Sequence, residues 1–317
     1  MKTRSFIIVL LLTSLASFAQ SNTTPSQSTP PPSQGAAAGQ AQGAAPAKPA
    51  GPRVLQAQSQ DEMKAFQDDM ALTDPDKVEA AATAFAAKYP NSQLRASLYI
   101  RAMNLYAQSN NTDKVIDTGR QAIAADPLNP VPLVQVASAL AESARDTDLD
   151  REQRLAEAAK DAHAAIDNID TGLLVPANAD PARVEGAKRS ILTMAYDTLG
   201  MVDLNKQDYT SAVTNLQKAI SESSGNPEAV LYLRLSVAQD KLKQYPQALD
   251  SANKAVQYAK DGTAAQNLAK QQQARLQKLM SSGQPAGGAA APMSPSPAPT
   301  TQQQTPSPAP TSPSNPH

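Results

Sequence analysis

Residues 196–219 read YDTLGMVDLNKQDYTSAVTNLQKA, and residues 232–255 repeat the pattern 36 residues later as YLRLSVAQDKLKQYPQALDSANKA. Tyr196 aligns with Tyr232, Leu199 with Leu235, and small residues recur between them at equal offsets. An earlier copy contains Tyr99, Ala102, Tyr106, Val115, Gly119 and Ala122. A self-similar pattern with this period predicts a stack of repeated structural units.

The spacing within each copy is helical. Met63, Phe66 and Met70 share one face of a helix, and no part of residues 61–280 shows sustained apolar–polar alternation. Asp-Pro and Asn-Pro pairs divide this region, since each disfavours helix before the proline and supplies a capping side chain. They lie at Asp74-Pro75, Asp126-Pro127, Asn129-Pro130, Asp180-Pro181 and Asn226-Pro227. The prediction is an all-α protein.

These positions resemble the tetratricopeptide repeat family, whose unit is a helix–turn–helix of about 34 residues. The resemblance covers residues 75–260 and is weakest in unit 130–169, which lacks the aromatic residue and carries an insertion near residues 145–152. It implies a right-handed superhelical array of antiparallel helix pairs, a TPR-like solenoid. Residues 263–280 are expected to form the polar capping helix that terminal repeats need.

Composition argues against chemistry. The chain has 317 residues, with 28 Lys and Arg against 29 Asp and Glu, two His and no Cys. The missing thiols exclude disulfides, cysteine metal sites and cysteine nucleophiles, and two His leave no histidine-based constellation. The balanced charge gives no basic footprint for nucleic acid. We therefore expect no enzyme activity, no catalytic residues, no cofactor and no metal.

Four segments differ in composition. Residues 1–19 read as a signal peptide, with Lys2 and Arg4 before the apolar stretch 6–12 and Ala19 at the cleavage site. Residues 20–60 and 281–317 are rich in Pro, Ala, Gln and Ser, so we expect disordered tails. Residues 61–280 form the repeat domain. We expect an exported protein of a Gram-negative periplasm or envelope, with no membrane span after cleavage, and no lipoprotein because Cys is absent.

The family resemblance implies that the first helix of each pair lines a concave groove for a partner peptide or helix. We expect a non-catalytic scaffold that binds proteins of the cell envelope. The alternative is a structural spacer whose Pro-rich tails contact the cell wall or membrane-associated proteins while the repeats self-associate. The candidate groove residues are Ile100, Asn104, Gln108, Val134, Ser138, Asp197, Met201, Asn205, Leu233, Val237 and Lys241.

Two loops carry competing interpretations. Asp146, Asp148 and Asp150 imitate the start of a calcium loop, but Arg151 stands where that loop needs glycine, so an acidic turn before a helix over 151–167 is preferred. The apolar run 172–176 either forms an exposed docking element or packs at the junction between the two halves of the array.

Overall fold

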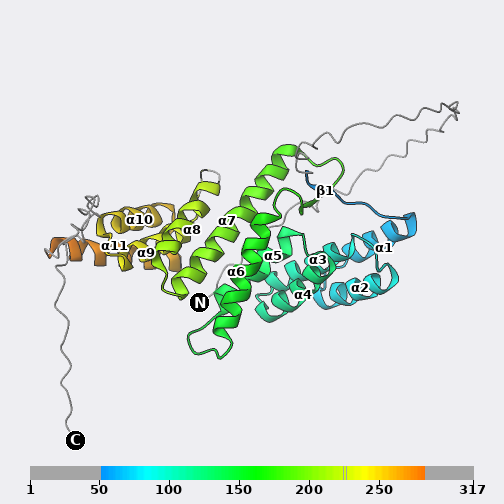
Figure 1. Ribbon diagram of the computed structural model, residues 1–317, viewed down its shortest axis with the longest axis horizontal. Coiled ribbons are helices and arrows are strands. Elements are labelled where there is room, and N and C mark those ends of the chain that lie inside the picture. Colours follow the sequence, from blue (N-terminus) through cyan, green and yellow to red (C-terminus); the bar gives the residue numbers. More distant parts are fainter. Residues whose placement is uncertain (1–50, 224, 226, 283–317) are drawn as a thin grey trace, which may run out of the picture.

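The computed structural model describes residues 51–282 except Ser224 and Asn226, so the predicted signal peptide and most of both predicted tails lie outside the described residues. The described residues form an elongated row of helices (Figure 1). Among them, no helix has both the length and the hydrophobicity that a membrane span requires. The helices are α1 Gln60–Met70, α2 Pro75–Lys88, α3 Arg95–Gln108, α4 Thr112–Ala125, α5 Pro130–Ser143, α6 Arg151–Asp167, α7 Pro181–Asn205, α8 Tyr209–Glu222, α9 Ala229–Lys241, α10 Tyr245–Tyr258 and α11 Ala264–Ser281.

Consecutive helices pack as pairs, which confirms the all-α, paired architecture. The most extensive contacts join α3 with α4, α5 with α6, α7 with α8 and α9 with α10. The second helix of each pair then packs on the first helix of the next, as α4 does on α5 and α8 on α9. Helices α1 and α2 precede these four pairs, and α11 closes the row on α10 and α9, at the place expected for a capping helix.

The helix boundaries follow local chemistry. Asp74, Asn129 and Asp180 each cap a helix that begins with proline, and their side-chain oxygens accept backbone N–H groups of the first turn. The turns within three pairs share another device. Asn110, Gln207 and Lys243 have φ of 57°, 61° and 60°, and the next residue donates its N–H five residues back. This left-handed residue ends the first helix and reverses the chain.

Small residues set the distance between neighbouring helices, both within a pair, as between α7 and α8, and between pairs, as between α4 and α5. A Cβ atom on Gly119 would lie 2.3 Å from Val136 Cγ2, and one on Gly200 would lie 2.7 Å from Leu216 Cγ. Neither separation is possible for non-bonded carbon atoms. The helices therefore approach through backbone surfaces that only glycine leaves open.

The hydrophobic core is divided along the row. One large cluster extends from α1 to α7 and includes the fully buried Leu98, Met103 and Ile191. Beyond α7, two small clusters follow, one around Leu216 and the other around Leu276. The C-terminal pairs consequently depend on their nearest neighbours, as expected for a repeat array.

An N-terminal strap, residues 53–58, crosses from the predicted tail onto the helical domain. Strand β1 (Arg53–Val54) pairs in parallel with β2 (Leu174–Val175), and Arg53 Nη2 donates to Asp126 Oδ2 at 2.7 Å and to the Gly172 carbonyl at 2.6 Å. The assignment of residues 53–60 to a disordered tail is therefore wrong, because backbone pairing and an ion pair hold them. The run 172–176 packs inward, with Leu173 and Val175 buried, so its interpretation as an exposed docking element is also wrong.

A polar network joins α2, α3 and α4. The Tyr106 hydroxyl is the donor for two carboxylates, Asp76 Oδ1 at 2.6 Å and Glu79 Oε2 at 2.7 Å, and Glu79 also accepts from Lys114 and Gln121. Burial alone would raise the pKa of Glu79, but the hydrogen bonds from Tyr106, Lys114 and Gln121 outweigh burial and lower it. The network therefore stabilises the ionised carboxylate.

We predict opposite effects for two Gly→Ala substitutions within helices. Gly119→Ala should lower the free energy of unfolding by about 1–3 kcal/mol because the new methyl group overlaps Val136 and Met103. Gly186→Ala, in α7 with no atom within 4 Å of its Cβ position, should raise it by about 0.5–1 kcal/mol. Urea unfolding followed by circular dichroism measures both. Equal effects would contradict the close approach.

We predict that Tyr106→Phe lowers stability by about 1–2 kcal/mol at neutral pH, because Asp76 and Glu79 lose a buried donor. A lowered pKa means that Glu79 contributes stability above its unfolded pKa and loses it as the pH falls through the folded value. The deficit should therefore shrink below about pH 4. Tyr99→Phe is the control, because the Tyr99 hydroxyl donates to the uncharged Thr83 hydroxyl at 3.4 Å. Its loss of stability should depend little on pH in the same unfolding assay.

Candidate partner-binding face

The first helices of neighbouring pairs crowd together on one side of the row. Helix α5 contacts α7, α7 contacts α9, and α9 contacts α11, whereas the described second helices α4, α6, α8 and α10 make at most marginal contact with one another. In a curved array the closely spaced side is the concave one. On this concave side, we call the exposed and partly exposed residues of α3, α5, α7 and α9 the inner face. They are Arg101, Asn104, Gln108, Gln135, Ser138, Glu142, Thr193, Asp197, Arg234, Val237 and Lys241.

Five polar atoms of the inner face are buried without a hydrogen-bond partner within the described residues. They are Arg101 Nε and Asn104 Oδ1 on α3, Gln135 Nε2 on α5, and Thr193 Oγ1 and Asp197 Oδ1 on α7. Folded proteins pair the great majority of such buried atoms, and each one left unpaired costs about 1–3 kcal/mol. Their recurrence on three successive first helices marks this face as incompletely satisfied in the isolated chain.

One ion pair spans two repeats on the inner face. The Arg234 guanidinium on α9 donates through Nη1 to Asp197 Oδ2 on α7. Both side chains are largely buried, with exposed fractions of 22% and 18%. Burial alone would lower the pKa of Arg234, but the charges of Asp197, Glu142 and Glu228 outweigh it and raise that pKa. Arg234 is therefore the cation around which three carboxylates gather.

Two of these carboxylates are unfavourably placed for ionisation. Burial raises the pKa of Glu142, on α5, and the negative charge of Asp197 adds to that effect, although Arg234 and a hydrogen bond with Ser138 oppose it. Burial and Asp197 likewise raise the pKa of Glu228, at the start of α9. Glu142 is nevertheless exposed. Its carboxylate can therefore be reached from solvent.

The structure removes three of the eleven sequence candidates. Ile100, Val134 and Met201 have exposed fractions of 9%, 0% and 7% and pack in the core cluster of α1 to α7. Because their side chains face neighbouring helices, they cannot contact a partner. Their prediction as groove residues is therefore wrong.

The other eight candidates reach the surface to different degrees. The Asn205 side chain already has hydrogen-bond partners. Its Oδ1 accepts from Arg151 Nη2 at 3.2 Å, which ties α6 to the end of α7, and its Nδ2 donates to the Met201 carbonyl at 2.9 Å. Gln108 and Lys241 are exposed, and Leu233 and Val237 are half-buried. Asn104, Ser138 and Asp197 belong to the polar part of the inner face described above. Their binding role stays a prediction.

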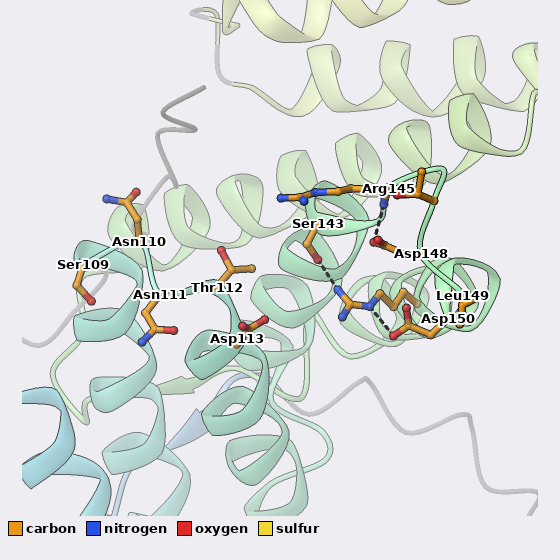
Figure 2. Close-up of a pocket in the computed structure, with 12 residues that line it drawn as sticks. Ser109, Asn110, Asn111, Thr112, Asp113, Ser143, Arg145, Asp148, Leu149 and Asp150 are labelled. Atoms are coloured by element: carbon orange, nitrogen blue, oxygen red, sulfur yellow. Dashed lines mark hydrogen bonds and ion pairs between the residues drawn. The ribbon is translucent and has the colours of Figure 1, made fainter.

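A separate polar pocket of about 930 Å³ lies beside the inner face, between the α3–α4 turn and the α5–α6 loop (Figure 2). Asn110, Asn111 and Asp113 line one side, and Arg145 and Leu149 line the other. Arg154 also lines the pocket, and it donates to Asp150 at 2.8 Å and to Ser143 at 3.1 Å. The insertion in unit 130–169 is the sequence signal for this pocket, since it supplies the longer loop.

The ion pairs around the α5–α6 loop argue against a calcium site there. Asp146 pairs with Arg151, Asp150 with Arg154, and Glu157 with Arg120, so the carboxylates turn toward separate arginines. Within residues 51–282 outside the two gaps, no three His, Asp or Glu side chains are grouped to hold a metal ion. Helix α6 begins at Arg151 and ends at Asp167, as the preferred interpretation predicted.

Sequence reasoning missed the charged residues where α5, α7 and α9 meet, and one uncharged polar residue of the inner face. Glu142, Glu228, Arg234 and Gln135 were not among the candidates. Their signal was the helical stripe itself, because Gln135, Ser138 and Glu142 follow one another at spacings of three and four.

No model of a known protein family matches the chain, and no curated protein matches it. Solved structures do align with it. The APC/C hetero-tetramer Cut9–Hcn1 aligns at 14% identity with a TM-score of 0.33, over 68% of this chain but only 42% of that one. The assembly chaperone of RpL4 (Acl4) aligns at 10% identity with a TM-score of 0.36, over 70% and 98% of the two chains.

A tetratricopeptide repeat protein from Parabacteroides merdae aligns at 11% identity with a TM-score of 0.26, over 68% of this chain and 99% of that one. Identities and scores this low carry no functional argument. The class of the protein therefore rests on its own helix pairs, turns and repeat spacing, which define a tetratricopeptide-like helical array.

We predict that Arg234→Met lowers the free energy of unfolding by about 2–4 kcal/mol at pH 7, since Asp197, Glu142 and Glu228 lose their shared cation. The loss should shrink at acidic pH, where the raised pKa values of Glu142 and Glu228 let both carboxylates neutralise first. Adding Asp197→Leu should restore part of the stability, because it removes the buried carboxylate that Arg234 no longer pairs.

Thermal and urea unfolding of the single and double variants test this prediction. Lys254→Met, which breaks the exposed ion pair with Asp250, is the control and should lower stability by about 0–1 kcal/mol. A single variant no less stable than that control would refute the shared-cation arrangement.

Proposed function

We propose that this protein is a non-catalytic scaffold that binds a partner polypeptide, as an extended peptide or a helix, on its inner face. One observation carries the proposal: Asn104, Gln135, Thr193 and Asp197 present buried polar atoms without partners along three consecutive first helices. A polypeptide brings backbone donors and acceptors at regular intervals, and it can satisfy such a row without any covalent chemistry.

The proposal includes the cell envelope as the place of action. Lys2, Arg4 and the apolar stretch 6–12 support export through a cleaved signal peptide. The absence of Cys from the whole chain fits an exported protein that is neither lipidated nor disulfide-bonded. Mass spectrometry of the purified protein from a Gram-negative host tests export, because cleavage would leave Gln20 as the first residue.

Site-specific photo-crosslinking of the full chain tests the binding face. A photoreactive amino acid replaces one of two exposed inner-face residues, Gln108 or Lys241, or one of two exposed residues of second helices, Asp117 or Asn253. We expect one envelope protein to be captured from the inner-face positions and not from the second-helix positions. Mass spectrometry identifies the captured chain.

Two outcomes would contradict the proposal. Capture only from Asp117 and Asn253 would place the partner on the opposite side of the array. Capture of a second copy of this chain alone, with loss of envelope association on deletion of residues 283–317, would favour the spacer with Pro-rich tails.

A further inference from the structure

The inner face carries an excess of negative charge where α5, α7 and α9 meet. Glu142 comes from the last turn of α5, Asp197 from the middle of α7, and Glu228 and Arg234 from α9. Asp197 and Arg234 each act electrostatically on Glu142 and on Glu228. Three carboxylates share one guanidinium, so with all of them ionised the cluster is two positive charges short of neutrality.

The carboxylates that lack a cationic partner can be named. Arg234 occupies only Oδ2 of Asp197, and Oδ1 is buried with no partner among the described residues. No ion pair in that part of the chain involves Glu142 or Glu228, and Arg234 is the one cation that acts on either of them. A further cation there would be attracted by all three carboxylates, and beside the largely buried Asp197 solvent screens charge less than at an open surface.

The polar atoms next to the cluster point to a polypeptide rather than a free ion. Thr193 Oγ1 lies one helical turn before Asp197 on α7, and Gln135 Nε2 lies two turns before Glu142 on α5. Both are buried and unpaired. A small cation would leave them so, whereas a peptide backbone supplies an acceptor for the amide and a donor for the hydroxyl.

The chain's own tails do not provide the missing charge. Residues 283–317 contain no Lys or Arg, and residues 20–50 contain only Lys48. Arg53 is already bound to Asp126 and Gly172 in the strap. A complementary occupant is therefore another protein.

We propose that this end of the inner face binds a basic segment of a partner polypeptide, with a Lys or Arg side chain placed between Glu142 and Glu228 and the adjoining backbone hydrogen-bonded to Gln135 and Thr193. The inference rests on the proposed scaffold function and adds the chemistry of its partner. It also gives a role to carboxylates whose charge is disfavoured in the free protein, because the same negative charge makes binding selective for a cationic partner.

Fluorescence anisotropy with defined peptide pools tests the inference on the full chain. Each pool holds labelled twelve-residue peptides with uncharged random positions and one fixed central residue, which is Lys and Arg in the first pool, norleucine in the second and Glu in the third. We expect the basic pool to bind at least tenfold more tightly than the norleucine pool and the Glu pool not to bind. The preference should weaken as salt rises from 50 to 300 mM.

A matched pair of double variants locates the effect. Glu142→Gln with Glu228→Gln removes two negative charges from the cluster, and Asp117→Asn with Asp167→Asn removes two from the exposed surface of α4 and α6. The first should abolish the preference for the basic pool, and the second should leave it within about twofold. The cluster variant should also unfold at an equal or higher urea concentration, since its carboxylates are held in an environment that disfavours their charge.

The outcomes separate this inference from the proposed function. Equal binding of the basic and norleucine pools, lost on Gln135→Ala, would overturn the cationic partner and leave the scaffold standing. A basic preference that survives the cluster variant would place the selectivity elsewhere and overturn the inference. Absence of binding by every pool would also overturn it, and the scaffold would then be judged by the crosslinking experiment alone.

Discussion

The distance between neighbouring helices, within a pair and between pairs, is set by residues that have no Cβ atom. Gly119 faces Val136 and Met103, and Gly200 faces Leu216, at separations that leave no room for a Cβ. Buried alanines continue the same close approach in the last pairs, as Ala212, Ala248 and Ala252 show. Since the chain has only four Phe, eight Tyr and no Trp, it gains packing from backbone proximity rather than from large side chains. The spacing of the first helices, and so the inner face, depends on this approach.

The carboxylates of the inner face are placed differently from those of the network between α2, α3 and α4. In that network Glu79 accepts hydrogen bonds from Tyr106, Lys114 and Gln121. At the junction of α5, α7 and α9, carboxylates outnumber cations and Asp197 keeps an unpaired oxygen. Stable proteins violate local rules mainly where function requires it. This contrast within one chain is the physical basis for placing the partner there.

The helical array could be predicted from sequence because its signals are local and repeated. The Asp-Pro and Asn-Pro boundaries, the bounds of α6 and the repeat spacing between Tyr196 and Tyr232 all depend on residues close together in the chain. The rotation of each helix could not be fixed as well. Each residue turns an α-helix by about 100°, so choosing Ile100 and Val134 rather than their neighbours Arg101 and Gln135 moved the candidates from the inner face into the core. The strap escaped prediction for another reason, since a two-residue parallel pairing has no periodic pattern.

The strap also imposes an order on assembly. Arg53 finds its acceptor at Gly172, 119 residues along the chain, so the first residues of the domain to leave the ribosome are among the last to reach their final contacts. Closing so long a loop is slow compared with docking adjacent helices. The pairs after α7 need only their immediate neighbours and can join one by one. The N-terminal half, joined end to end by the strap, thus completes as a unit, whereas the C-terminal pairs fold onto it one after another.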